Sequence, residues 1–362
     1  MGIRIDKDTL EAAVLGGAVL GGGGGGWIEE GREVGLLALE RGFSGILSID
    51  EFPEEALLLT VSAVGAPSAG KDVVDPDDYI RAVVLFIEKS RLKIDGLISS
   101  EIGAIGVVNG WLQSAALRIP VADAPCNGRA HPLALMGSMG LGQKADYVSL
   151  QAAVGGTGDG GSRVETFLKG SIEEISGSIR EASVKAGGMV AVARNPVPAR
   201  YVRRNGAPGA IDMAVRIGRM MMASENVKPE AAVKRIVAGL DGDILLRGCT
   251  EKVELRTEAG LDIGRIWIET DGRSAEICFW NEYMTLEIDG ARLATFPDLI
   301  MTFEAGSAQP LVSAEIEEGQ EVLVIAVPSG KLILGAGMRD TGLLRRIEQA
   351  IGKDIVKCGN PG

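Results

Sequence analysis

The chain has 362 residues and a formal net charge of −12, with 46% hydrophobic but only 4% aromatic residues. Because single hydrophobic cores rarely grow beyond roughly 250–300 residues, this length predicts two domains. The acidic balance argues against a nucleic-acid groove, which needs a basic surface. The sequence has no run of about 18 or more apolar residues, so no membrane span is predicted.

The chain opens with two predicted helices joined by glycines. Residues 6–20 have the apolar spacing of a core helix rather than a signal peptide. Six glycines follow at 21–26, and a second helix begins at Trp27. Backbone N–H groups at a helix N-terminus suit an anion or a developing oxyanion, although a flexible connection is the alternative. The glycines expected to contact the substrate or an anion are Gly22, Gly23, Gly24 and Gly25.

Two predicted strands each end in an acid. The strand at 96–99 runs into Glu101, and the next strand, at 119–122, stops at Asp123. If these strands are parallel neighbours, their ends lie about 5 Å apart. Two carboxylates at such a place suit a general acid–base pair or a metal site, and two separate helix caps are the alternative.

The segment 119–132, which reads IPVADAPCNGRAHP, gathers four kinds of reactive side chain, including the only histidine of the chain. Strand ends that enter polar loops are where open α/β sheets place their ligands. A tight turn with a buried cysteine and a capping aspartate is the alternative. The expected catalytic set is Cys126, His131, Asp123, Glu101 and Arg129.

The four cysteines form no CxxC pair, which indicates reduced thiols and a cytoplasmic location rather than a disulfide framework. From about residue 241 the pattern changes to short alternating stretches, among them 244–246 and 253–256, which predict an antiparallel barrel or sandwich. We therefore expect a three-layer α/β domain with a mostly parallel sheet over residues 1–240. A small antiparallel β-barrel domain should cover 241–330, and residues 331–362 should return to the first domain.

Several motifs occur together in a familiar order. They are LGGGGGG (20–26), EIG (101–103), PVAD…GRAHP (120–132), PGAIDMAVRIGR (208–219), NE (281–282) and FPDLI (296–300). In this combination the chain resembles the family named after S-methyl thiohydantoin desulfurase, formerly a domain of unknown function and often encoded beside hydantoinases. The resemblance implies an α/β domain joined to a small β-barrel. It also implies hydrolysis of a substituent on a five-membered ring, with release of a thiol.

The central segment departs from the family pattern, which reads D-x-D-x-M-G-R-A-F-P-E. Asp123, the residues at 128–130 and Pro132 agree with it. Pro125 and Leu133 stand in place of two acids, and Ala104 replaces a glycine elsewhere. Cys126 and His131 are also unusual at their positions, which suggests altered chemistry or a changed substrate on a retained scaffold.

Four interpretations follow. In the first, Cys126 attacks a hydantoin-like or thiohydantoin-like ring with His131 as base, while an acid orients the groups and Arg129 or the glycine amides hold the developing charge. In the second, Cys126, His131 and Asp123 bind Zn²⁺. In the third, the protein is a non-catalytic subunit of a hydantoinase-like complex. In the fourth, Cys126 and His131 are structural. The expected partners are a small-molecule substrate and either further copies of the chain or a hydantoinase-like subunit.

Overall fold

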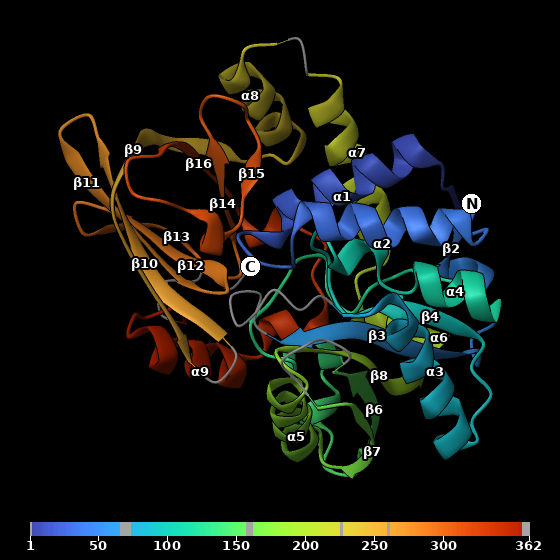
Figure 1. Cartoon of the computed structure of the whole chain (residues 1–362). Helices are drawn as coiled ribbons and strands as arrows, with labels where there is room; N and C mark the ends of the chain where they lie inside the picture. Colours follow the sequence, from blue (N-terminus) through green and yellow to red (C-terminus); the bar gives the residue numbers. More distant parts are fainter. Residues whose placement is uncertain (1, 66–73, 157–161, 225–226, 259–260, 357–362) are drawn as a thin grey trace.

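The computed structural model of the protein describes residues 2–65, 74–156, 162–224, 227–258 and 261–356. These residues form a mixed α/β structure with three sheets, drawn in Figure 1. No helix within these ranges has both the length and the apolar character that crossing a membrane requires.

The helices predicted over 6–20 and from Trp27 and the strand predicted at 96–99 are present, whereas the strand predicted at 119–122 is reduced to Ala122–Asp123. The helices are α1 (Lys7–Gly21), α2 (Ile28–Glu40), α3 (Pro76–Ser90), α4 (Trp111–Leu117), α5 (Ile172–Lys185), α6 (Ala199–Asn205), α7 (Ala210–Met222), α8 (Pro229–Gly239) and α9 (Thr341–Ile351). The strands of the first two sheets are β1 (Ile3–Arg4), β2 (Gly45–Ser48), β3 (Leu57–Gly65), β4 (Gly96–Ser99), β5 (Ala122–Asp123), β6 (Ser149–Gly155), β7 (Val164–Gly170) and β8 (Met189–Pro198). The third sheet contains β9 (Asp243–Glu258), β10 (Leu261–Thr270), β11 (Arg273–Trp280), β12 (Glu282–Ile288), β13 (Ala291–Thr295), β14 (Leu299–Glu304), β15 (Pro310–Leu311) and β16 (Glu321–Val327).

The five-stranded sheet has the order β4-β3-β8-β6-β7, and α3 and α5 pack against it. Only β3 and β4 are parallel, while β8 is antiparallel to both of its neighbours and β7 is antiparallel to β6. The expectation of a mostly parallel sheet is therefore wrong for this sheet. The buried Ala- and Val-rich strands have the same apolar pattern in either direction, so their sequence does not reveal how they run.

Helix α1 is buried along almost its whole length because it packs between α2 and α7. The crossing with α7 is close: a Cβ on Gly16 would overlap the carbonyl oxygen of Ala214, and one on Gly218 would overlap that of Ala12. The helix ends where Gly22 adopts the left-handed conformation (φ 59°) and its N–H bonds to the carbonyl of Val19. The glycine segment is thus delivered from a fixed helix into the middle of the molecule.

The eight-stranded antiparallel sheet has the order β13-β12-β11-β10-β9-β16-β14-β15. Among the described residues no ladder joins β13 to β15, so the expected barrel is corrected to an open sheet. The sheet nevertheless curls, because β12 contacts β14 across it. Tyr283 carries this contact: its hydroxyl lies 2.7 Å from Thr302 Oγ1 and donates to the carbonyl of Leu311 at 3.0 Å. The hydrogen bonds of the Tyr283 side chain, rather than a backbone ladder, therefore connect the two ends of the curled sheet.

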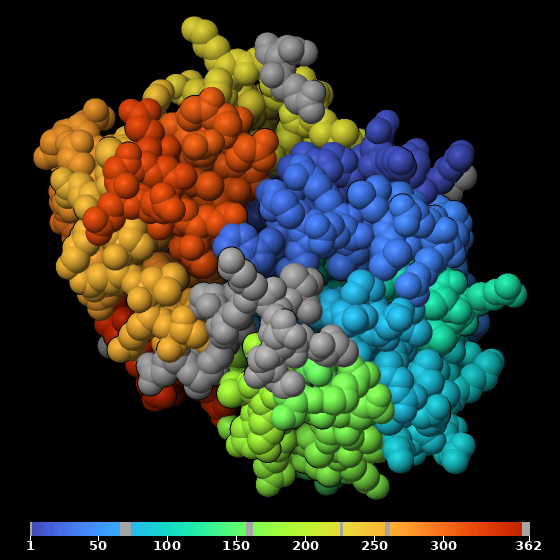
Figure 2. Space-filling view, in the orientation of Figure 1, coloured from blue at the N-terminus to red at the C-terminus, as the bar shows by residue number. Residues whose placement is uncertain are grey.

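The C-terminal helix α9 packs against β11 of this sheet. Its apolar residues, among them Leu344 and Ile347, share a cluster with Trp280 and Phe296 of the sheet region and with Met136 of the N-terminal half. In Figure 2 the surfaces of α1 and α2 (blue) and of the C-terminal strands (orange) meet along one boundary. The division of the chain near residue 240 stays a prediction.

Candidate active site

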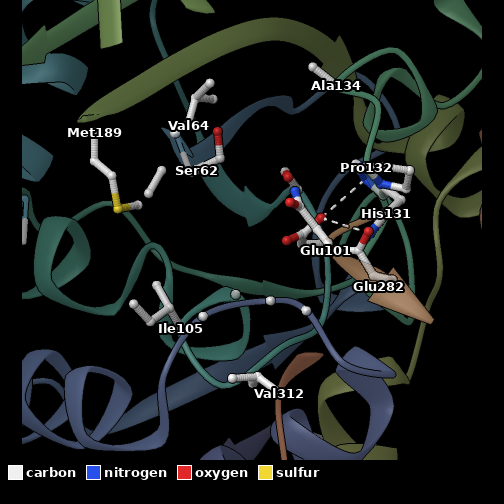
Figure 3. Close-up of a pocket in the computed structure, with 18 of the residues that line it drawn as sticks. Ser62, Val64, Glu101, Ile105, His131, Pro132, Ala134, Met189, Glu282 and Val312 are labelled. Carbon is white, nitrogen blue, oxygen red and sulfur yellow. Dashed lines mark hydrogen bonds and ion pairs between the residues drawn. The ribbon is translucent and has the colours of Figure 1, made fainter. Parts of the chain in front are cut away.

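A cavity of about 400 Å³ lies where the glycine segment, the ends of β3 and β4, the segment after His131 and the eight-stranded sheet meet. Figure 3 shows two kinds of wall. Glu101, His131 and Glu282 lie together on one side, and Val64, Met189 and Ile105 lie away from them. Residues that line the cavity include Gly23, Gly24, Gly25, Glu30, Glu101, His131, Arg180, Arg194, Glu282 and Ser313.

The glycine segment is a tightly packed wall of this cavity. Its carbonyls accept backbone hydrogen bonds from both halves of the chain: Gly22 from Tyr283 (2.7 Å), Gly23 from Ser313 (2.8 Å) and Gly25 from Ile105 (3.0 Å). A Cβ on Gly24 would overlap Glu282 Oε1. The segment therefore needs glycine because other backbone and side chains approach it closely.

Gly23, Gly24 and Gly25 line the cavity as the sequence suggested, whereas Gly22 lies outside its lining. A Cβ on Gly22 would come within 2.6 Å of Arg129 Nη2. Gly22 therefore supports the buried arginine behind the wall, and the three glycines after it present their backbone to the cavity.

Glu101 follows β4 and reaches the cavity with its carboxyl group. Its Oε2 accepts the backbone N–H of His131 at 3.3 Å and lies 3.4 Å from His131 Nε2 (Figure 3). Burial raises the pKa of Glu101 to about 7, against the opposing effect of the His131 N–H. The carboxyl group is therefore poised to gain or lose a proton near neutral pH.

Glu282 begins β12 and enters the same cavity from the eight-stranded sheet. It is 2% exposed, and its Oε2 has no hydrogen-bond partner among the described residues. Burial, and then the negative charge of Glu101, raise the pKa of Glu282 well above its ordinary range. Sequence reasoning gave this residue no role, although the polar Asn281–Glu282 pair between two predicted strands marks it.

His131 is buried beside Glu101, and neither ring nitrogen has a hydrogen-bond partner among the described residues. Burial, and then the positive charge of Arg194, lower the pKa of His131 to about 3. The imidazole is therefore neutral wherever Glu101 is ionised, and the 3.4 Å contact is not an ion pair at neutral pH.

Cys126 lies outside the cavity lining and is fully buried in an apolar cluster. Its sulfur is 3.4 Å from Thr60 Oγ1, and its N–H donates to the carbonyl of Ser99. Burial raises the pKa of Cys126 to about 11, so the group is a thiol at neutral pH. A thiol in this position is neither exposed to a ligand in the cavity nor activated as a nucleophile.

Asp123 is also outside the cavity lining, because it caps helix α7. Its two carboxyl oxygens accept the N–H groups of Ile211 (2.8 Å) and Asp212 (3.3 Å). Burial raises the pKa of Asp123 to about 6 in spite of these bonds. The carboxyl group is thus occupied by a helix N-terminus, which is a common role for aspartate.

Arg129 lies behind the cavity wall, fully buried. Its Nη1 donates to the carbonyls of Pro297 (3.0 Å) and Asp298 (2.5 Å), and its guanidinium stacks on the Phe296 ring at 4.7 Å. Burial lowers the pKa of Arg129 to about 10, with the charge of Glu282 opposing it, so the group stays positive at neutral pH.

The proposed zinc ligands lie in three different environments. Cys126 contacts Thr60, Asp123 caps α7, and only His131 lines the cavity. Within the part of the chain that the structure describes, no group of three or more His, Cys, Asp or Glu side chains is arranged to hold a metal ion. These residues do not fit a zinc site, and we derive no chemical step through one.

Two family matches cover the chain. Residues 8–164 match the description "S-Me-THD-like, N-terminal domain", and residues 171–338 match "S-Me-THD-like, C-terminal domain". The chain belongs to the S-Me-THD-like family. The suspected relationship to the S-methyl thiohydantoin desulfurase family is thereby confirmed. Glu101 comes from the N-terminal domain of this S-Me-THD-like protein and Glu282 from its C-terminal domain.

A crystal structure of a protein from Chromobacterium violaceum has the same fold as this S-Me-THD-like chain. The two are 20% identical, the match covers 96% of this chain and 97% of the other, and the TM-score is 0.72. The search of curated proteins returned no match.

Proposed function

We propose that this protein is a hydrolase of a thiohydantoin-like five-membered ring compound, in which Glu101 and Glu282 are the general base and the general acid. The observation that carries the proposal is that both carboxyl groups line one cavity and have raised pKa values. Two neighbouring carboxyls that cannot both ionise readily share a proton, which provides an acid and a base at the same pH. The family name supports the class of substrate.

The chemistry needs one proton acceptor and one proton donor. Glu101 removes a proton from a water molecule as the water oxygen attacks the ring carbon that bears the sulfur. The electron pair of the ring C=N bond moves to the nitrogen in this step and re-forms the double bond when the sulfur leaves. The C–S bond of the tetrahedral intermediate then breaks, and Glu282 gives its proton to the departing thiolate. The products are a ring carbonyl and a thiol, and the proton gained by Glu101 later restores Glu282.

The neighbouring groups support these roles. The backbone N–H of His131 donates to Glu101 Oε2, which fixes the direction of the base. The backbone of the glycine segment packs against Glu282 and leaves that side chain little freedom. Arg129 places a buried positive charge near both carboxyls, which limits how far their pKa values rise. Cys126 has no chemical role in this proposal.

The proposal is tested by thiol release from an S-methyl thiohydantoin, measured with a thiol-specific reagent. We expect Glu101→Gln and Glu282→Gln each to lower kcat by about 10²- to 10⁴-fold, the usual contribution of a positioned acid or base. Glu321→Gln, on the exposed part of β16, is the matched control and should keep the wild-type rate. Wild-type protein that releases no thiol, or cavity variants as fast as the control, would contradict it.

A further inference from the structure

Glu30 is an acid of the cavity wall that the proposed acid–base pair does not use. Four acidic residues line the cavity, namely Glu30, Glu101, Asp262 and Glu282. Glu101 and Glu282 form the proposed pair, and Asp262 accepts a hydrogen bond from Thr257 at 2.8 Å. Glu30 is 8% exposed, and its Oε1 has no hydrogen-bond partner among the described residues. Burying such a carboxyl group lowers stability, so its retention points to a ligand.

The position of Glu30 in helix α2 does not explain it. Glu30 is the third residue of the helix, where an ionised glutamate is favoured by the helix dipole or bonds back to the backbone of the first turn. Here burial, and then the charge of Glu33, raise the pKa of Glu30 to about 7, so the neutral form is well populated at neutral pH. The Tyr79 hydroxyl, whose pKa is raised by burial and then by Glu30, has no partner among the described residues and so does not bond to it.

We propose that Glu30, as a neutral carboxylic acid, recognises the amide edge of the substrate ring, accepting from its N–H and donating to its C=O. A protonated carboxyl group offers an O–H donor beside a C=O acceptor, which matches an amide held cis in a ring. An S-methyl thiohydantoin has one such edge, so the inference rests on the proposed function. Ser62, beside Val64 in the cavity wall (Figure 3), is a second observation: it is 4% exposed and its Oγ is also unpaired among the described residues. The cavity therefore holds polar atoms that only a polar ligand would pair.

The test is calorimetry on the full-length protein with hydantoin, which keeps the amide edge but has no sulfur to release. Glu30→Gln retains a donor beside an acceptor, so its affinity should stay within about threefold of the wild-type value, whereas Glu30→Met removes both and should weaken binding about tenfold or more. The ligand 1,3-dimethylhydantoin has no N–H and should show no such difference between the variants. Glu40→Met, at the exposed end of α2, is the matched control and should bind hydantoin as the wild type does.

Glu30→Met should also unfold at a higher temperature than the wild type, because an apolar side chain replaces a buried carboxyl group, and this separates lost binding from misfolding. The assignment is overturned if wild-type protein does not bind hydantoin, if Glu30→Met keeps full affinity, or if Glu30→Gln loses as much affinity as Glu30→Met. Thiol release separates the inference from the proposed function. Release by the wild type together with unchanged affinity in Glu30→Met refutes the inference alone. Weakened affinity in Glu30→Met, in a protein that releases no thiol, supports the inference and refutes the proposed hydrolysis.

Discussion

At the level of single residues, three glutamates line one cavity, two of them almost fully buried and the third, Glu101, with 22% of its side chain exposed. They are Glu30, Glu101 and Glu282, and burial is the largest cause of the raised pKa of each. Burying a carboxyl group without hydrogen-bonded partners lowers stability, and apolar side chains of similar size would avoid this cost. Residues that oppose stability in this way mark a functional site more reliably than reactive residue types do.

Cys126 contrasts with these glutamates. A cysteine in this segment suggested a nucleophile, but the side chain is buried in an apolar cluster outside the cavity lining. With the thiol buried and its pKa raised to about 11, we expect iodoacetamide at pH 7.5 to label Cys126 more slowly than the partly exposed Cys249. Peptide mass spectrometry over a time course measures both rates in the same sample. If Cys126 is labelled first, and His131→Ala slows that labelling, Cys126 is an activated thiol and the interpretation of Cys126 as the nucleophile is supported instead.

The sequence located part of the site and missed the rest for a physical reason. Glu101 and His131 were expected there from the strand ends before them, and both line the cavity. Asp123 and Cys126, from the same segment, are taken up by a helix cap and an apolar cluster. Glu282 begins β12, far along the chain from Glu101, and the pairing of the eight-stranded sheet places it in the same cavity. The spacing of apolar residues within one strand does not predict such long-range pairing.

At the level of elements, the glycine segment of the N-terminal domain accepts backbone hydrogen bonds from the C-terminal domain. Gly24 is the position where a substitution tests this packing best. Gly24 does not have a left-handed φ, so alanine fits the backbone there. Its effect comes from the added Cβ, which would overlap Glu282 Oε1. We expect Gly24→Ala to displace Glu282 and lower thiol release by at least about tenfold, as small misplacements of reacting groups do. Thermal unfolding should shift by only a few degrees.

Gly177→Ala is the matched control for this substitution. Gly177 lies within α5, and a Cβ there meets nothing within 4 Å. Alanine should leave activity unchanged and stabilise the helix by about 0.5–1 kcal/mol. If Gly24→Ala loses stability but retains full activity, the segment is a structural connection and not a wall that positions Glu282.

The elements themselves were easier to predict than their arrangement. Helix α1 was expected over residues 6–20 and spans Lys7–Gly21, because its apolar spacing and its Asp6 cap are local signals. The strands expected at 244–246 and 253–256 are one long strand, β9, whose pairing with β10 is interrupted by a register shift. Apolar spacing on each side of such an irregularity has the appearance of two strands. Strand direction and the open edge depend on distant partners, which the local pattern does not encode.

At the level of the whole molecule, the cavity is assembled from both family domains, so neither domain contains the site alone. The N-terminal domain supplies Glu101 and the glycine segment, and the C-terminal domain supplies Glu282. Backbone bonds from Tyr283 and Ser313 to that segment fix the two domains together at the reacting groups. The open sheet holds Glu282 against the N-terminal half, where the proposed mechanism needs it.

The pH dependence of thiol release tests the shared-proton pair most directly. Protonation of Glu101, whose pKa is raised to about 7, should remove the base, so kcat/KM, which reports on the free enzyme, should fall as the pH decreases through about 7. Ionisation of Glu282, whose pKa lies well above its ordinary range, should remove the acid and give a second fall at higher pH. We predict a bell-shaped profile in the wild-type protein. A rate that stays constant from pH 5 to pH 8 would contradict the central claim, because both carboxyl groups would then ionise as ordinary glutamates do.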